Sequence, residues 1–447
     1  MKKLITIIVV LLISGTTYAQ FSLYGEFRPR TEFNHGYKTL MPAQGEMFSL
    51  GTSQRTRLGF GYRTDKYSFG LQIQDVRFWG STPQLASVDG FTTTIHQAWA
   101  EVKLADKLSV KAGRQELVYD DHRILGNVGW AQQARSHDLA LFKYEDGFKL
   151  HLGLAVNQVQ TRPYPTPKNY KSMQYIWFNK EFSDAYTLSI LALNNGVDDT
   201  TLNNGTGSSM TTFSQIIGQR SVFKTGAIKI GFNFYYQMGN DKAAYFDAAD
   251  KINKHKKYSA MNIGIDVSYK LSDNIKLGIG YEFLSGNSQT DTTIEYSQTN
   301  HAFNPLYGTN HKFNGWMDYF YVGNHNNSVG LQDIYLKLDY SKNKFIAGAA
   351  FHYFMSAADV FDVEETMSTG NITAMSSGLG MELDTYVGYK HSKGVLFKAG
   401  VSGMFDSATM RALKGGDNGA SNYWGWVMLV VKPTFINGKK AKTPPAK

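Results

Sequence analysis

The chain has 447 residues, no cysteine and a formal net charge of +9 at pH 7. The lack of cysteine excludes a fold supported by disulfides, and the charge is mild for this length and does not indicate nucleic-acid binding. After residue 20 no stretch supplies the ~18 consecutive apolar residues that a transmembrane helix needs. Tyrosine, phenylalanine and glycine are abundant and proline is scarce, a composition that suits long strands.

Residues 1–19 have the pattern of a secretory signal peptide. Lys2 and Lys3 form a positive start, and residues 4–13 form an apolar run that is too short to span a bilayer. The tripeptide Thr-Tyr-Ala at 17–19 resembles a cleavage site, so we place the mature start at Gln20. The sequence therefore predicts an exported protein.

Residues 55–65, RTRLGFGYRTD, alternate between two kinds of side chain. Leu58 and two aromatic residues occupy every second position, and arginines and glycines fill the positions between them. Successive side chains of a strand point to opposite faces, so this strand has one apolar and one basic face. In a soluble sandwich the apolar face would pack the core. In a membrane barrel it would meet lipid, and Arg55 and Arg57 would face the lumen.

The same period of two recurs along the chain and defines eighteen strand candidates. Short connections, such as 104–107 and 271–274, alternate with long polar ones, such as 288–327. An even number of long strands with this alternation is the arrangement of bacterial outer-membrane barrels. We predict strands that begin near residues 20, 51, 66, 91, 107, 131, 147, 171, 184, 211, 225, 257, 274, 328, 343, 377, 393 and 421.

We therefore predict an all-β fold, a transmembrane antiparallel β-barrel of about 18 strands with short periplasmic turns and long extracellular loops. A secreted β-helix or sandwich is disfavoured, because the chain lacks a short regular repeat and Gly/Pro punctuation. The predicted parts are a signal peptide at 1–19, a single barrel at 20–435 and a disordered basic tail at 436–447. Phe435 ends the last predicted strand.

The chain carries few signs of catalytic or metal chemistry. Neither His-Glu-x-x-His nor Gly-x-Ser-x-Gly occurs. Asp120, Asp121 and His122 form one candidate cluster, but adjacent residues of a strand point to opposite faces and only part of it can converge. Pairs such as Gly278 and Gly280 lie inside strands, where they relieve crowding in the lumen. We predict no catalytic residue, no metal site and no cofactor.

Arginine is concentrated near the start of the chain, since nine of the twelve arginines precede residue 136, whereas lysine is spread throughout. Arginine keeps its charge and offers a planar fork for carboxylates. Two interpretations stay open: arginines and acids form a ladder that satisfies buried charge, or surplus arginine makes one wall of a pore positive and concentrates anions. The candidate pore-lining and constriction residues are Arg28, Arg30, Arg55, Arg57, Asp75, Arg77, Glu101, Arg114, Arg123, Arg135, Asp138, Glu382 and Asp384.

Residues 113–144, GRQELVYDDHRILGNVGWAQQARSHDLALFKY, resemble the signature region of the alginate-export family of outer-membrane channels. The matching pieces are GRQ at 113–115, the DDHRILG segment, Trp130 and the pair of Arg135 and Asp138. The resemblance implies an eighteen-stranded monomeric barrel whose basic constriction passes an anionic polysaccharide outward. It places Arg114, Arg123, Arg135 and Asp138 in the constriction network, with Arg55, Arg57, Asp75 and Arg77 on the same wall.

We thus expect an outer-membrane channel, not an enzyme, with an arginine-rich lumen for anionic or sugar-like solutes. The most specific form of this expectation is a channel that exports an alginate-like exopolysaccharide. The expected partners are the lipid bilayer of the outer membrane, an anionic polysaccharide or small anionic solutes, and periplasmic export proteins, with no nucleic acid. Residues 288–327 are the expected lid or plug.

Three alternatives differ in what they require. A general diffusion porin with weak ion selectivity has the same fold and a less charged constriction. A barrel lipase or protease needs a Ser-His or Asp-His set, which the alternation does not assemble. A TonB-dependent transporter needs a much longer chain with an N-terminal plug.

Overall fold

The computed structural model describes residues 20–82, 84, 93–157, 170–199, 210–247 and 252–438. Residues 1–19 lie outside the described residues, and so do residues 439–447 of the predicted tail, so the signal peptide and the tail stay predictions. Gln20, the expected mature start, is the first residue of strand β1.

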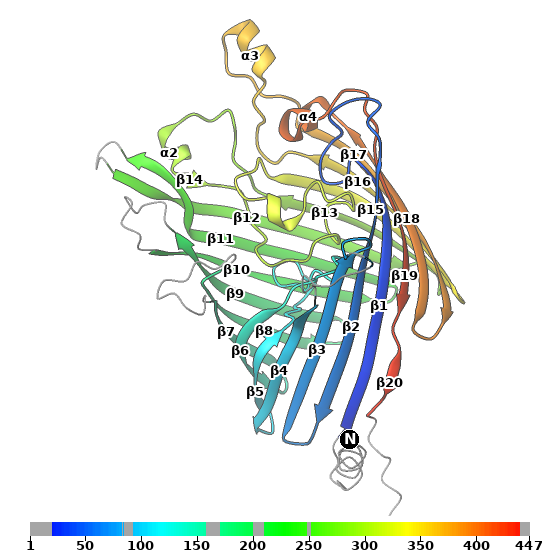
Figure 1. Ribbon diagram of the computed structural model, residues 1–447. Coiled ribbons are helices and arrows are strands. Elements are labelled where there is room, and N and C mark those ends of the chain that lie inside the picture. The colour runs from blue at the N-terminus through cyan, green and yellow to red at the C-terminus, as the bar shows by residue number, and fades with distance from the viewer. Residues whose placement is uncertain are drawn as a thin grey trace, which may run out of the picture.

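Eighteen long strands form a closed antiparallel barrel (Figure 1), because β1 pairs with both β2 and β19. This confirms the predicted fold class and strand number. The strands are β1 (Gln20–His35), β2 (Ser49–Arg63), β3 (Tyr67–Phe78), β4 (Thr93–Ala105), β5 (Leu108–Gln115), β6 (His137–Glu145), β7 (Lys149–Val156), β8 (Ser172–Ser183), β9 (Tyr186–Asp199), β10 (Met210–Thr225), β11 (Ile228–Asp247), β12 (Ile252–Lys270), β13 (Ile275–Leu284), β15 (Leu331–Lys342), β16 (Phe345–Met355), β17 (Gly378–Ser392), β18 (Val395–Asp406) and β19 (Asn422–Val431).

The remaining elements are short. Strand β14 (Thr299–Asn300) runs parallel to the start of β12, and β20 (Thr434–Ile436) pairs with β1. Helices α2 (Ile294–Ser297), α3 (Val363–Thr369) and α4 (Ala408–Lys414) lie at the end of the barrel away from the N-terminus (Figure 1), and η1 (Val322–Asn324) is a single 3₁₀ turn. None of the helices in the described residues has the length and apolar character that crossing a bilayer takes.

The alternation of side chains places an apolar surface outside the barrel. In β2, Leu58 is 38% exposed, whereas Arg55 and Arg57 are 4% and 8% exposed. In β7, Leu152 and Leu154 point outward, and His151 is buried on the inner side. An apolar outer face of this kind is stable only against lipid. The apolar face of residues 55–65 therefore lies on the lipid side, as predicted.

The predicted strand starts fall within three residues of the observed ones except at two strands. Strand β12 was expected near residue 257 and begins at Ile252, because the β11–β12 hairpin extends further above the barrel. Strand β6 was expected near residue 131 and begins at His137, because the preceding residues leave the wall.

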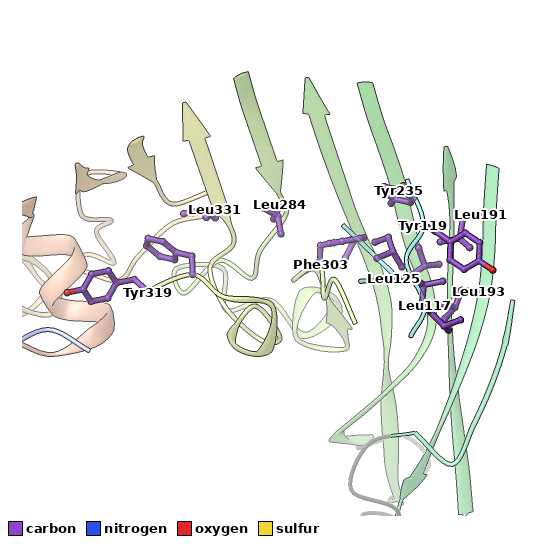
Figure 2. Packing of buried hydrophobic residues seen from close by; sticks show 14 of the residues in the cluster. Leu117, Tyr119, Leu125, Leu191, Leu193, Tyr235, Leu284, Phe303, Tyr319 and Leu331 are labelled. Carbon is purple, nitrogen blue, oxygen red and sulfur yellow. The ribbon is translucent and has the colours of Figure 1, made fainter. Parts of the chain in front are cut away.

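Two connections turn into the barrel. The first inward segment, residues 116–136, joins β5 to β6, and the second inward segment, residues 285–330, joins β13 to β15. Their apolar side chains form a buried cluster with the inner faces of the strands. Figure 2 shows Leu117 and Leu125 of the first inward segment beside Leu191 and Leu193 of β9. The core of the molecule thus lies within the barrel, around the two inward segments.

Candidate functional site

The inner faces of β1 and β2 carry four arginines that tether the first inward segment, and we call them the basic wall. Arg28 donates to the carbonyl oxygens of Gly129 and Trp130 at 2.9 Å each. Arg55 donates at 3.3 Å to the carbonyl oxygens of residues 131 and 132. A carbonyl oxygen accepts these bonds without neutralising the guanidinium. The basic wall comprises Arg28, Arg30, Arg55 and Arg57, each less than one-tenth exposed.

Three carboxylates face the basic wall. Arg55 lies 2.7 Å from Glu26, and Arg30 lies 3.0 Å from Glu32. The carboxylate of Glu116 lies 3.8 Å from Arg57 and is shared with a histidine at 2.7 Å. Among the described residues, Arg28 has no carboxylate within 4.0 Å. Four arginines against three carboxylates leave the wall with an excess of positive charge.

The ring of Trp130 joins the basic wall to the second inward segment. The guanidinium of Arg30 lies 4.3 Å from the ring centroid. The imidazole of His311 stacks on the same indole at 4.2 Å with an interplanar angle of 13°. Two tryptophans of β19, Trp424 and Trp426, meet the ring edge-on. The indole therefore connects the inner faces of β1 and β19 to the second inward segment.

Backbone hydrogen bonds join the two inward segments directly. The amide of Gly126 donates to the carbonyl of Tyr307, and the amide of Thr309 donates to the carbonyl of His122, both at 2.9 Å. The guanidinium of Arg135 adds a bond of 2.8 Å to the carbonyl of residue 308. The segments support each other and narrow the lumen together.

The second inward segment is held by four buried carboxylates that we call the acidic wall. Glu382 accepts from the amide of Met317 at 2.7 Å, and Asp384 accepts from the amide of Trp316 at 3.3 Å. Gly315 lies so close to Glu382 that an added Cβ would come within 2.6 Å of the carboxylate, and its φ of +82° also favours glycine. The acidic wall comprises Glu282, Asp333, Glu382 and Asp384, on β13, β15 and β17.

Charged residues of the first inward segment reach the far side of the barrel. Arg123 is 1% exposed and pairs with Glu282 at 2.7 Å. Asp121 accepts from Arg220 of β10 at 2.8 Å, and Arg220 also lies 3.0 Å from Asp266 of β12. The first inward segment is thus anchored to both sides of the barrel by ion pairs and hydrogen bonds.

Buried ionisable groups on the inward segments have shifted pKa values. Burial raises the pKa of Asp120 to about 6, although the Trp177 indole donates to its carboxylate. Burial lowers the pKa of the His325 imidazole to about 3, and the positive charge of Arg123 adds to the effect. Burial alone would raise the pKa of Asp318, but hydrogen bonds and charge from His311 outweigh it and lower the pKa.

Cavities lie on both sides of the inward segments. A cavity of about 560 Å³ opens along β8–β15. A second of about 330 Å³ lies between the first residues of β1 and β3, the last residues of β2 and the middle of β4. A third of about 390 Å³ lies around residues 135–138 and 306–323. The inward segments line the first and the third. This arrangement fits a narrowed passage better than a catalytic pocket, and no group of three potential metal ligands gathers within the described ranges.

A family model described as alginate export matches residues 20–391. This chain belongs to the alginate export family. No curated protein matches it in a sequence search.

Solved porins of low sequence identity share the fold of this alginate export family member. OccAB1 of Acinetobacter baumannii gives a TM-score of 0.58 at 13% identity and covers 95% of this chain and 99% of its own. OccK11 (OpdR) of Pseudomonas aeruginosa gives 0.56 at 12% identity, over 94% and 96%. The structure of Pseudomonas aeruginosa OpdK with vanillate gives 0.54 at 11% identity, over 92% and 99%. Family and fold together establish a channel of the cell outer membrane that contacts the lipid bilayer.

The structure places most of the predicted site residues of this alginate export family member inside the barrel. Arg123 and Arg135 belong to the first inward segment, and Glu101 lies on the inner face of β4, 2.5 Å from Lys143. The members of the basic wall and both predicted carboxylates of β17 are buried around the inward segments.

Two predicted residues lie on the outer side of the wall, which corrects their expected place. Asp75 and Arg77 share the outer face of β3 with Ile73, because the residue opposite Arg57 is Gln74. Two-residue periodicity gives this side, since Asp75 continues the apolar face of β3.

Arg114 and Asp138 lie opposite each other at the ends of β5 and β6 that adjoin the first inward segment, where they pair at 2.9 Å. Both border the cavity of about 390 Å³ together with Arg135 and Tyr307.

Sequence reasoning missed several residues that organise the lumen. Neither Glu282 nor Gln132 belongs to a group of charged residues in the sequence, so composition gives no signal for them. A weak signal exists for Arg220, an isolated arginine on the inner face of a strand. Lysine is distributed evenly along the sequence, so its distribution does not indicate a site.

Proposed function

We propose that this outer-membrane channel passes anionic or sugar-like solutes, and that export of an acidic exopolysaccharide is its most specific form. The proposed constriction lies where the inward segments meet, lined by the basic wall, by Arg123 and Arg135, and by Glu382 and Asp384 on the opposite side. Glu101 lines the lumen below it. No chemical step is involved, and selectivity comes from fixed charge.

The observation that carries the proposal is the excess of buried arginine on β1 and β2. The guanidinium groups of these arginines donate hydrogen bonds to backbone carbonyls. The positive charge of Arg28 is therefore held in place without a carboxylate partner. Fixed charge beside low-dielectric walls attracts counter-ions and raises their local concentration. An anion crossing the lumen would therefore follow the basic wall and avoid the acidic wall.

Two comparisons with known proteins also favour an anionic solute. The family model is described as alginate export, and alginate is an acidic polysaccharide. The structure of Pseudomonas aeruginosa OpdK was determined with vanillate, a carboxylate. Both point to carboxylated solutes, although the fold alone is compatible with many solutes.

Proteoliposome swelling tests the proposal with a matched pair of solutes. Galacturonate should enter liposomes that contain the wild-type protein faster than galactose, which has the same ring without the carboxylate. Arg55→Gln with Arg57→Gln should reduce this preference, because both charges lie inside the barrel. Arg77→Gln with Lys66→Gln removes the same charge from the outer face of β3 and from the exposed turn before it, and should leave the preference unchanged. Equal entry of the two sugars in the wild type would refute anion preference.

A general diffusion porin is the second candidate. The acidic wall favours it, because four buried carboxylates offset much of the charge of the basic wall. In that case galacturonate and galactose would enter equally, and the arginines would serve only to tether the first inward segment.

A further inference from the structure

The lipid-facing surface of the barrel is hollowed across β13, β15 and β16. An apolar groove of about 460 Å³ lies there, within the range of pockets that hold a small ligand, ~300–1,000 Å³. Leu277, Leu338 and Phe351 line the groove, and all three are exposed on the outer face. The groove therefore opens toward the membrane and not toward the lumen.

A small residue of β16 creates the groove. In the strand register Ala349 lies opposite Leu338 of β15. The next outward row is formed by the larger side chains of Leu336, Phe351 and Leu383. The methyl group of Ala349 leaves room for a hydrocarbon chain beside them. Because lipid tails are as apolar as leucine, the groove selects a chain by shape and gives no preference for one lipid headgroup.

Two joined periplasmic turns close to the groove carry lysines and no acid. Residues 340–346, around the β15–β16 turn, and residues 388–395, around the β17–β18 turn, contain no aspartate or glutamate. The amide of Lys390 donates to the carbonyl of Lys344 at 2.7 Å, and the ammonium of Lys344 donates to the carbonyl of His391 at 3.1 Å. Three exposed lysines of these turns form what we call the lysine patch: Lys342, Lys344 and Lys393.

The charge of the lysine patch is not matched by the chain itself. In the part of the chain that the structure describes, no member lies within 4.0 Å of a carboxylate. The turns β2–β3, β4–β5, β6–β7, β8–β9 and β12–β13 each contain an aspartate. At the last of these, Lys270 pairs with Asp273 at 2.6 Å. Lysines next to a membrane attract anionic lipids, so the patch offers its charge to an anionic headgroup.

The groove and the lysine patch are placed for one ligand. Along β15, Leu338 of the groove and Lys342 of the patch are four residues apart, roughly 14 Å. Tyr340 lies between them on the same outer face. The rings of Phe345 and Tyr389, with centroids 5.1 Å apart, lie at the same end of the neighbouring strands. Aromatic residues of this kind mark the level of the lipid headgroups.

We infer that the groove and the lysine patch together bind one anionic phospholipid of the inner leaflet, with an acyl chain in the groove and the phosphate at the lysines. A zwitterionic phospholipid with the same chains fits the groove equally well, but its ammonium group is repelled by the patch. The site lies on the outer surface of the barrel, so the inference does not rest on the proposed function.

Native mass spectrometry of the purified protein, released from a non-ionic detergent, tests the headgroup. The probes are dioleoyl phosphatidylglycerol and dioleoyl phosphatidylethanolamine, which share their acyl chains. Lys342→Gln, Lys344→Gln and Lys393→Gln together should raise the dissociation constant of the first phosphatidylglycerol about tenfold or more, since tenfold corresponds to 1.4 kcal/mol. Phosphatidylethanolamine should bind as it does to the wild type. The control removes the same charge from other periplasmic turns and should change either constant less than about twofold: Lys66→Gln, Lys103→Gln and Lys224→Gln.

A second pair of variants tests the groove. Ala349→Phe fills the groove and leaves the lysine patch intact, so it should weaken the binding of both lipids. Ala140→Phe is the matched control, because Ala140 lies on the lipid-facing side of β6, between the buried Leu139 and Leu141. Retained heat-modifiable mobility on a denaturing gel shows that each variant has folded as a barrel.

The outcomes decide for or against the lipid site. Loss of the phosphatidylglycerol preference in the lysine variant, together with weaker binding of both lipids to Ala349→Phe, supports it. An unchanged preference in the lysine variant overturns it, and so does unchanged binding to Ala349→Phe. Successive phosphatidylglycerol molecules that bind the wild type with equal affinity would indicate an unselective lipid shell and would also overturn the site.

Discussion

The basic wall and the acidic wall hold the two inward segments by opposite chemistry. Arg28 and Arg55 donate to the backbone carbonyls of residues 129–132, whereas Glu382 and Asp384 accept from the backbone amides of residues 316 and 317. A peptide backbone offers both kinds of partner, so either sign of charge can fix a segment within the lumen. The two walls differ in the sign of their net charge.

The free-energy cost of burial also differs between the two walls. A guanidinium has five donors and stays charged, so several carbonyls can satisfy it. Glu382 and Asp384 are close neighbours on the inner face of β17 with no exposed surface, and two buried carboxylates repel each other when both are ionised. We therefore expect the first inward segment to be the more firmly held. Variants that loosen one segment at a time should reveal this difference.

Removing the second inward segment should have the largest effect. A short Gly-Ser linker in place of residues 288–327 removes residues that line the cavities of about 560 and 390 Å³ and removes the bonds to the first inward segment. Single-channel conductance should therefore rise severalfold. A matched control shortens the exposed connection around α3 at 363–369, which lies outside the lumen, and should leave conductance unchanged. Unaltered conductance after the deletion would show that this segment does not limit the passage.

Loosening the first inward segment should have the second-largest effect on conductance. Arg28→Ala with Arg55→Ala removes charge-assisted hydrogen bonds worth about 1.5–3 kcal/mol each and takes away the side-chain donors to the carbonyls of Gly129 and Gln132. We expect frequent transitions to a more conducting state in single-channel recordings. Arg63→Ala, at the exposed periplasmic end of β2, is the control. A steady wild-type current in the double variant would mean that other contacts suffice to hold the segment.

Single changes in the acidic wall should have a smaller effect. Glu382→Ala leaves the buried amide of Met317 without an acceptor, at a cost of about 1–3 kcal/mol. Glu382→Gln keeps an acceptor oxygen and removes the repulsion from Asp384, so it should hold the segment as well as the wild type. Protease sensitivity of the second inward segment in detergent measures both. Equal sensitivity of the two variants would argue against the acceptor role of Glu382.

Acid should act on the two segments in opposite directions. His325 has its pKa lowered to about 3, so the released segment binds more protons below pH 6.5 and acid favours release, by about 2 kcal/mol at pH 5. Asp120 has its pKa raised to about 6, so the docked segment binds more protons and acid favours docking, by about 1 kcal/mol between pH 7 and 5.

Conductance between pH 7.5 and 5 measures these effects with two variants. His325→Gln should reduce acid-induced opening, and Asp120→Asn should increase it. If both variants follow the wild-type pH profile, neither group controls the docking of its segment.

The sequence predicts the barrel well because the lipid-facing side of each strand must be apolar at every second position. That constraint is local, so eighteen strands can be read from the chain, and even the facing of Arg55 follows from its neighbours. The interior follows no such rule. Residues 116–136 pack within the lumen through contacts with strands about a hundred residues away, such as those of Asp121 with Arg220 and Asn233. The periodicity of the sequence does not indicate these contacts.

The candidate site was therefore predicted only in part. Clustered arginines indicated a basic wall, yet nothing in their spacing showed that their partners are backbone carbonyls. Asp75 and Arg77 were assigned to the lumen by charge, although their positions in β3 place them outside. Lys229, Lys276 and Lys337 line one cavity only because of the register of β11–β15, and Lys312 joins them through the fold of the second inward segment.

The most direct measurement is the reversal potential of the wild-type protein in a planar bilayer under a potassium chloride gradient. We expect a potential displaced toward the chloride equilibrium value, because the four arginines of the basic wall face only three carboxylates. A potential displaced toward the potassium value, or close to zero, would contradict the claim that positive charge governs passage.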